Sequence, residues 1–428
     1  MKDIAGIPYT TAEFDKNGKC IGKPVLPDDA REVMIVSHGW NNDRGEAEQL
    51  YKTLFENIGK VNPGVRQGMA IVGVIWPSKK FDFSPDEAAA AGTGAVGAAA
   101  TGGGADDGHA LVARSLDAFD KAFEDSGKNA ELAQLRALAP RLDKPEAQTA
   151  FIETLRKMVD DPDANADLDG SRFFFNQSDA RAVFKLALQP DSGAGGGNGG
   201  TGGQGAQAVS GVGLGKLFGG IGNAVSSLLN ITTYYEMKKR AGTVGSTGLA
   251  PLIDEFGARA AVRHVHLVGH SFGARLVTAA AMTSTTDKLY SLSLLQGAFS
   301  HNGFSKIGYF RNVVDKQRLA GPIIVTHTRN DSAVGKAYAI ASRISGDMAE
   351  EFGGPNDKYG GLGSNGAVRM DASEVSAAVR QLLAVGKEYK LEKQLIHNLE
   401  SSAFISNHGD VAGPEVAWAI SRAVASAG

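Results

Sequence analysis

Cysteine is almost absent from the sequence: Cys20 is the only one among 428 residues. One cysteine excludes an internal disulfide framework and any zinc site built from several thiolates. The N-terminal stretch MKDIAGIPYTTAEFD also lacks an apolar run, because it is polar and charged. No ordinary signal peptide is therefore predicted, and we expect a cytoplasmic protein or one exported by a signal-peptide-independent route.

The sequence has no excess of positive charge either. Its 44 Lys and Arg against 47 Asp and Glu give a net charge of −3, so we expect no nucleic-acid partner. Hydrophobic residues make up 43% and charged residues 21%, which is close to the globular average and excludes global disorder. The length fits one large α/β domain with an insertion, or two domains.

Short apolar runs and helix-length segments alternate near the N-terminus. Glu32–Ser37 is apolar without alternation, as buried parallel strands are, and a second such run spans Met69–Trp76. A helix is predicted between them, over 44–59. Strand, helix and strand form a βαβ unit, which favours a mostly parallel central sheet flanked by helices.

This rhythm is lost after residue 77 and resumes near residue 231. The segment 78–230 is predicted to be a mainly helical, Gly-rich insertion, a cap or lid, between the core parts 1–77 and 231–428. Within it, 15 of the 30 residues of Gly193–Gly222 are glycine, and such a tract cannot hold one backbone conformation cheaply. It is read as a lid that meets lipid, with peripheral membrane contact, or as a plain flexible connector.

The other expected elements are as follows. Helices in the insertion are predicted over 109–125, 129–139, 145–160 and 176–189; the later core is predicted to contain helices over 231–257, 272–285 and 373–385 and a final helix from Pro414, with strands at Arg263–Gly269, Leu289–Gln296, Pro322–Thr328 and Gln394–Leu399.

The strongest chemical signal is Gly269-His270-Ser271-Phe272-Gly273, a G-x-S-x-G sequence. It follows an apolar strand-like run and opens an apolar helix, which is the context of a nucleophile elbow. A sharp strand-to-helix turn holds the serine in strained φ/ψ, and side chains two residues to either side would clash. Ser271 Oγ would then point out of the sheet at the positive end of the following helix. The alternative is an ordinary Gly-flanked loop.

An acid and a base for this serine are found by position. Asp331 follows a late strand, although it would also suit an Asx-turn or a helix N-cap. His408 lies on the loop after the last strand, where a catalytic base is expected. Asp410 is a weaker alternative acid, since it would have to fold back over two residues. Histidines inside strand patterns are read as structural: His264, His266 and His397.

With its HGW-N-N loop at 38–42 and its G-H-S-F-G elbow, the chain resembles α/β-hydrolase-fold enzymes of the lipase and esterase type, and bacterial proteins among them. The resemblance covers about 31–76 and 231–425, and not the insertion. It implies a serine nucleophile, then an acid, then a histidine in chain order, which Ser271, Asp331 and His408 match.

Such an enzyme needs two backbone N–H donors for the oxyanion, expected from Phe272 and Trp40. Gly39 would allow the loop after the first core strand to approach the site closely. Trp40 could alternatively be an aromatic residue that only covers the end of the sheet. His270 and His301, with Asn302, are predicted to lie near the substrate.

The function predicted from the sequence is hydrolysis of carboxylic esters, with acyl esters or lipids as substrates and no cofactor or metal. Alternatives left open are an acyltransferase, an amidase, a phospholipase-type antibacterial effector, and a non-catalytic interaction module. A calcium loop at Asn165–Gly170 is disfavoured, because Asn176 stands where the bidentate glutamate should be.

Overall fold

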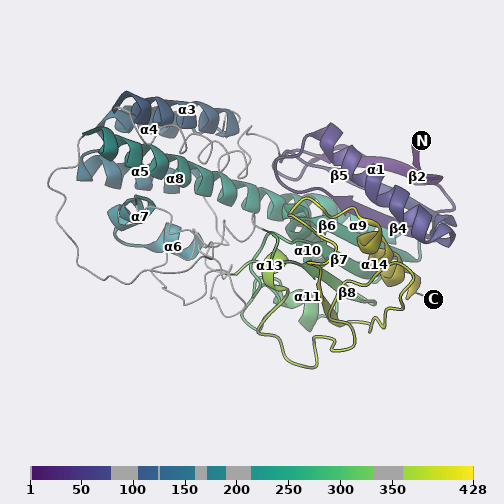
Figure 1. The fold of residues 1–428 in the computed structure, drawn as a ribbon. Helices are drawn as coiled ribbons and strands as arrows, with labels where there is room; N and C mark the ends of the chain where they lie inside the picture. Colours follow the sequence, from purple (N-terminus) through teal and green to yellow (C-terminus); the bar gives the residue numbers. More distant parts are fainter. Residues whose placement is uncertain are drawn as a thin grey trace. The chain divides into compact units, whose positions relative to one another are not determined.

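The computed structural model describes residues 2–78, 105–123, 126–159, 171–188, 214–331 and 360–427, drawn in colour in Figure 1. The chain divides into two compact units. The core unit combines Met1–Lys80, Asp161–Phe173 and Tyr235–Gly428, and the helical unit combines Phe81–Asp160 and Phe174–Tyr234.

A mostly parallel sheet forms the centre of the core unit. In the described residues it has nine strands in the order β1-β2-β5-β4-β6-β7-β8-β9, with β3 on β2. From β2 to β9 all neighbours are parallel, and only β1 and β3 run antiparallel to β2. The strands are β1 (Lys2–Ile4), β2 (Ile7–Phe14), β3 (Cys20–Gly22), β4 (Glu32–Ser37), β5 (Met69–Ile75), β6 (His264–His270), β7 (Leu289–Leu295), β8 (Ile323–His327) and β9 (Ile396–Glu400).

Alternate residues of each central strand pack on opposite faces of the sheet. In β4, Met34 and Val36 belong to the cluster that includes residues of α1 (Arg44–Val61) and α14 (Pro414–Ala425). Val33 and Ile35 are equally buried but lie outside that cluster. A strand covered on both faces must be apolar throughout, which is why the unbroken run predicted a buried parallel strand. The prediction of a mixed α/β fold with a mostly parallel sheet flanked by helices is confirmed.

The first helix next to the sheet starts at a side-chain cap. Asp43 accepts a hydrogen bond from Glu46 N while the Glu46 carboxylate accepts one from Asp43 N, so a capping box begins α1. α10 (Phe272–Thr283) packs against β6 and against the π-helical turn η3 (Val244–Leu249), which leads into α9 (Ala250–Gly257).

The helical unit has its own apolar core, which includes Phe119, Phe151 and Phe184, all fully buried. Its described helices are α3 (Ala105–Phe123), α4 (Asn129–Leu138), α5 (Pro145–Met158), α7 (Ala180–Ala187) and residues 214–234 of α8 (Leu214–Thr243). α6 (Ser171–Asn176) crosses the division between the units. The helix predicted over 176–189 is therefore shorter, and α6 precedes it.

The helix predicted over 373–385 is wrong. This segment is irregular, and its backbone pairs with β9 instead: Ser376 N donates to Ile396 O over 2.8 Å, and Leu382 N donates to Glu400 O over 2.9 Å. β9 is the last strand in the sheet order, and this segment satisfies backbone N–H and C=O groups along its outer edge. These long-range hydrogen bonds override the local helical pattern.

The helix predicted over 231–257 begins too late. α8 starts at Leu214, so the last part of the glycine tract is helical rather than irregular. Ile221, Val225 and Leu228 are buried at helical spacing, and this apolar stripe offsets the entropy cost of the glycines. Residues 193–213 and the acidic segment 160–170, with its proposed calcium loop, lie outside the described residues.

Among the helices that the structure describes, none combines the length and the apolar character needed to cross a bilayer.

Candidate active site

The carboxyl ends of four parallel strands bring the predicted site residues to one edge of the sheet. Ser271 directly follows β6, Asp331 follows β8, and His408 lies on the loop after β9. The loop that begins with His38 follows β4, the neighbour of β6. In open parallel sheets this edge is where ligands bind, because successive strands end in the same direction.

Ser271 occupies a strained turn between β6 and α10. Its φ of 57° and ψ of −123° lie outside the regions that L-residues normally adopt. A Cβ on Gly269 would lie 2.4 Å from Gly273 O, and one on Gly273 would lie 2.3 Å from Ser37 O. Both clashes involve backbone atoms, which cannot move aside, so both positions require glycine. The turn also holds Ser271 N within 3.0 Å of Leu295 O.

Ser271, His408 and Asp331 form one chain of hydrogen bonds. His408 Nε2 lies 2.8 Å from Ser271 Oγ, and His408 Nδ1 lies 2.9 Å from Asp331 Oδ2. With the histidine proton on Nδ1, that nitrogen donates to the carboxylate and Nε2 accepts from the serine hydroxyl. The Asp331 side chain is fully buried, whereas 21% of the His408 side chain is exposed. His408 can therefore contact water, while the Asp331 carboxylate cannot.

The alternative acid, Asp410, is engaged elsewhere. Its Oδ2 accepts hydrogen bonds from Ser406 N at 3.0 Å and Ser406 Oγ at 2.8 Å. These bonds stabilise the loop that carries His408. Of the two acids that the sequence offered, the structure joins only Asp331 to the histidine.

The loop after β4 lies directly against the serine. A Cβ on Gly39 would lie 2.6 Å from Ser271 Cβ and 3.2 Å from Ser271 Oγ, so only glycine fits there. The Trp40 ring lies 6.1 Å from the Phe272 ring, tilted by 51°. The side chains of the two residues predicted as oxyanion donors are thus neighbours.

His270 contacts the base rather than an open surface. Its Nε2 donates to His408 O over 2.9 Å, and the two rings are 4.9 Å apart. Burial, with the nearby His408 ring, lowers the pKa of His270 to about 3. His270 is therefore neutral and holds the backbone of the His408 loop. Whether it also contacts substrate remains a prediction.

His301 connects two segments of the core unit. It is fully buried, its ring Nδ1 lies 3.1 Å from Asn365 Nδ2, and its backbone N–H donates to Gly360 O over 2.9 Å. These contacts tie the loop after β7 to the segment around α13 (Leu362–Asn365). The substrate role of His301 remains a prediction.

The three histidines that were predicted to be structural lie away from the sheet edge that carries Ser271. His264 and His266 both contact the carboxylate of Glu32 at the start of β4, over 3.0–3.2 Å. His397 contacts the backbone of Glu392 over 3.0 Å. Across the part of the chain that the structure describes, no group of three or more His, Cys, Asp and Glu side chains is arranged to hold a metal ion.

His38 is a site neighbour that the sequence reasoning did not single out. Its N–H donates to Tyr51 Oη over 2.9 Å, its carbonyl accepts from Trp76 Nε1 over 3.1 Å, and its ring stacks on Trp76 at 5.6 Å and 14°. Burial lowers the pKa of His38 to about 4. The one signal in the sequence was its position, directly before Gly39.

Two buried neutral histidines predict a loss of stability in mild acid. The unfolded chain takes up protons near the ordinary histidine pKa of 6.5, whereas folded His38 and His270 bind them only near pH 4 and 3. The free energy of unfolding should therefore fall as the pH drops below 6.5, by about 1 kcal/mol per histidine at pH 5.5. Urea unfolding of the Ser271→Ala variant at pH 7.5 and 5.5 measures this. Equal midpoints would contradict it.

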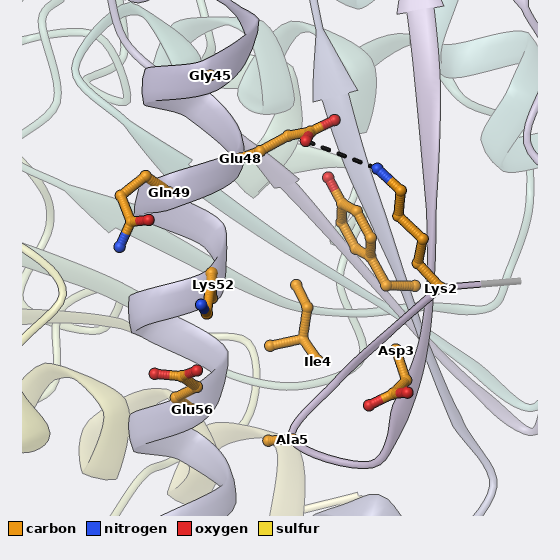
Figure 2. Close-up of a pocket in the computed structure, with 10 residues that line it drawn as sticks. Lys2, Asp3, Ile4, Ala5, Gly45, Glu48, Gln49, Lys52 and Glu56 are labelled. Carbon is orange, nitrogen blue, oxygen red and sulfur yellow. Dashed lines mark ion pairs between the residues drawn. The ribbon is translucent and has the colours of Figure 1, made fainter.

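Two surface grooves of about 500 Å³ each lie elsewhere on the core unit. Figure 2 shows one, between β1 and α1, where Lys2 and Glu48 form an ion pair of 3.9 Å. Lysines and carboxylates are mixed along it, including Asp3, Lys52 and Glu56, so it offers no concentration of one charge. Neither groove is lined by a residue of the Ser271 site.

Comparison with protein-family models, curated proteins and solved structures finds no match to this chain. The interpretation of the site therefore rests on its geometry and chemistry.

Proposed function

We propose that this protein is a serine hydrolase that cleaves carboxylic esters through an acyl-enzyme intermediate. The observation that carries the proposal is the hydrogen-bonded chain from Ser271 Oγ through His408 to Asp331. The left-handed backbone of Ser271 at the start of α10 supports it, because this strained turn presents Oγ beyond the strand end. We further propose that the core unit is an α/β-hydrolase fold and that the helical unit is its cap.

The proposed reaction has two halves. His408 Nε2 takes the proton of Ser271 Oγ as that oxygen attacks the ester carbonyl carbon. The carbonyl oxygen becomes an oxyanion, stabilised by the N–H groups of Phe272 and Trp40. When the tetrahedral intermediate collapses, the C–O bond to the alcohol breaks and His408 gives its proton to the departing oxygen. Asp331 stabilises the imidazolium throughout.

Water then repeats the sequence on the acyl-enzyme. His408 takes a proton from water, the hydroxide attacks the acyl carbon, and the carboxylic acid leaves as Ser271 Oγ regains its proton. The partial exposure of His408 supports water as the acceptor. None of these steps uses a cofactor. The preference for lipid acyl groups rests on the apolar, Gly-rich insertion in the sequence.

A fluorophosphonate probe tests the nucleophile without knowledge of the natural substrate. We expect stoichiometric labelling of Ser271, located by mass spectrometry of the digested adduct, because an activated serine attacks the probe's phosphorus, expels fluoride and becomes a phosphonate ester. Chromogenic esters with acyl chains of two to sixteen carbons then size the acyl site, and phospholipid vesicles show whether membrane lipids release fatty acid. An intact protein that takes up no probe and hydrolyses no ester would contradict the proposal.

A further inference from the structure

His38 is enclosed by the ends of β4 and β5 and by the residues after them. Tyr51 Oη accepts from His38 N over 2.9 Å and donates to Val74 O over 2.6 Å. Ser78 Oγ donates to Asn42 O over 2.9 Å and closes the far end of the same loop. Only 1% of His38 is exposed, so its ring packs against protein atoms rather than solvent.

The two ring nitrogens of His38 have different partners. Trp76 N–H points at Nε2 over 3.4 Å, and a backbone N–H can only donate, so Nε2 is the accepting nitrogen. Nδ1 lies 2.9 Å from Gly39 O, and a carbonyl oxygen can only accept. Ser78 Oγ also lies 3.4 Å from Nδ1, but it donates its one hydrogen to Asn42 O and so leaves Nδ1 as the donor. Burial lowers the pKa of the ring to about 4, which leaves one proton at neutral pH. That proton is on Nδ1 and is donated to Gly39 O.

This hydrogen bond determines the orientation of the peptide between Gly39 and Trp40. In a trans peptide the C=O and N–H groups point in opposite directions, so a carbonyl held toward His38 turns the Trp40 N–H away from it. Gly39 itself lies against Ser271, where a Cβ would be 3.2 Å from Oγ. A glycine resists rotation of its flanking peptides less than other residues do, so the orientation depends on an outside contact.

We propose that His38 is the positioning residue of the oxyanion site, whose Nδ1–H fixes the Gly39–Trp40 peptide with the Trp40 N–H facing the reacting carbonyl oxygen. The inference rests on the proposed hydrolase function. Without His38 the peptide can rotate and present a carbonyl oxygen where the oxyanion forms, which repels it. Loss of one oxyanion donor typically lowers kcat by about 10²–10³-fold.

A pair of amide variants separates positioning from packing. In His38→Asn the amide NH₂ lies close to the place of Nδ1 and can still donate to Gly39 O, whereas in His38→Gln it lies near the place of Nε2. We expect His38→Gln to lower kcat by about 10²-fold with little change in KM. His38→Asn should recover most of that loss. His397→Gln is the matched control, because His397 is equally buried but lies on β9 with Glu392 as its partner.

Binding of a boronic acid, which forms a tetrahedral adduct on the serine, gives a second readout. It should weaken in His38→Gln and not in His397→Gln. The positioning role would be overturned if the Asn and Gln variants lost kcat equally and if these losses matched the decrease in their melting temperatures. If the wild type shows no Ser271-dependent labelling or turnover, the hydrolase function itself fails, and the oxyanion role with it.

A spectroscopic measurement tests the tautomer directly, without an activity assay. Histidine-selective ¹⁵N labelling reports which nitrogen carries the proton, and we expect a neutral His38 ring protonated on Nδ1. His38→Asn, as the lost resonance, provides the assignment. A ring protonated on Nε2 would overturn the proposal whatever the turnover of the variants.

Discussion

Ester hydrolysis falls by about 10⁴-fold or more when Ser271 is replaced by alanine, if the hydrogen-bonded chain at the sheet edge acts as proposed. Alanine removes the only atom that can form the acyl-enzyme, while its backbone accepts the same φ of 57° at a similar strain. The variant should therefore fold normally. Initial rates on the best chromogenic ester, compared with the wild type under saturation, measure the effect.

The control for this variant is Ser293→Ala. Ser293 is a buried serine on β7, next to the strand that leads to Ser271, and is 1% exposed. It should keep the wild-type rate. Replacing His408 or Asp331 in the Ser271→Ala background should cost little more, because the three groups act as a unit. A Ser271→Ala variant that retains a tenth of the wild-type rate would exclude the mechanism.

Replacing Gly273 by alanine should lower the free energy of unfolding by at least about 3 kcal/mol. The new methyl group would lie 2.3 Å from Ser37 O and 2.5 Å from His38 O, both backbone atoms at the end of β4. Relief requires α10 and the Gly39 loop to move apart. Stability and activity should then fall together. Urea unfolding followed by circular dichroism measures the first, and ester turnover the second.

Gly64→Ala is the matched control in the same unit. A Cβ there would meet only Asn62 Oδ1, at an ordinary contact distance of 3.5 Å. Its unfolding free energy should stay within about 0.5 kcal/mol of the wild type. A Gly273→Ala protein as stable as Gly64→Ala would show that the contact between α10 and β4 is looser than described.

Much of the core unit follows from local sequence. The buried strands β4, β5, β6, β7 and β8 are short apolar runs, and α1 and α10 begin at a capping box and at the elbow. These features depend on neighbours in the chain, so periodicity and turn chemistry predict them. The order Ser271, Asp331, His408 also follows, because each residue comes directly after a strand or on the last loop.

Other features depend on contacts between distant residues. The segment 373–385 has a helical pattern, but it pairs with β9 through backbone groups that no pattern records. The sequence did not predict the start of α8, because this part of the chain is rich in glycine. Its apolar stripe stabilises a helix only when the rest of the helical unit buries it. The surroundings of His38 bring together Tyr51 and Trp76, which only the folded sheet places side by side.

The sheet also has a consequence for synthesis of the chain. β4 pairs with β6, and Glu32 contacts His264 across 232 positions of sequence. While the chain emerges from the ribosome, β4 therefore has an open edge until β6 has been made, and such edges are prone to wrong pairing. Ser271, Asp331 and His408 all emerge after that pairing becomes possible. No incomplete chain that ends before His408 carries all three proposed residues, so under the proposed mechanism the growing polypeptide hydrolyses no ester until residue 408 has been made.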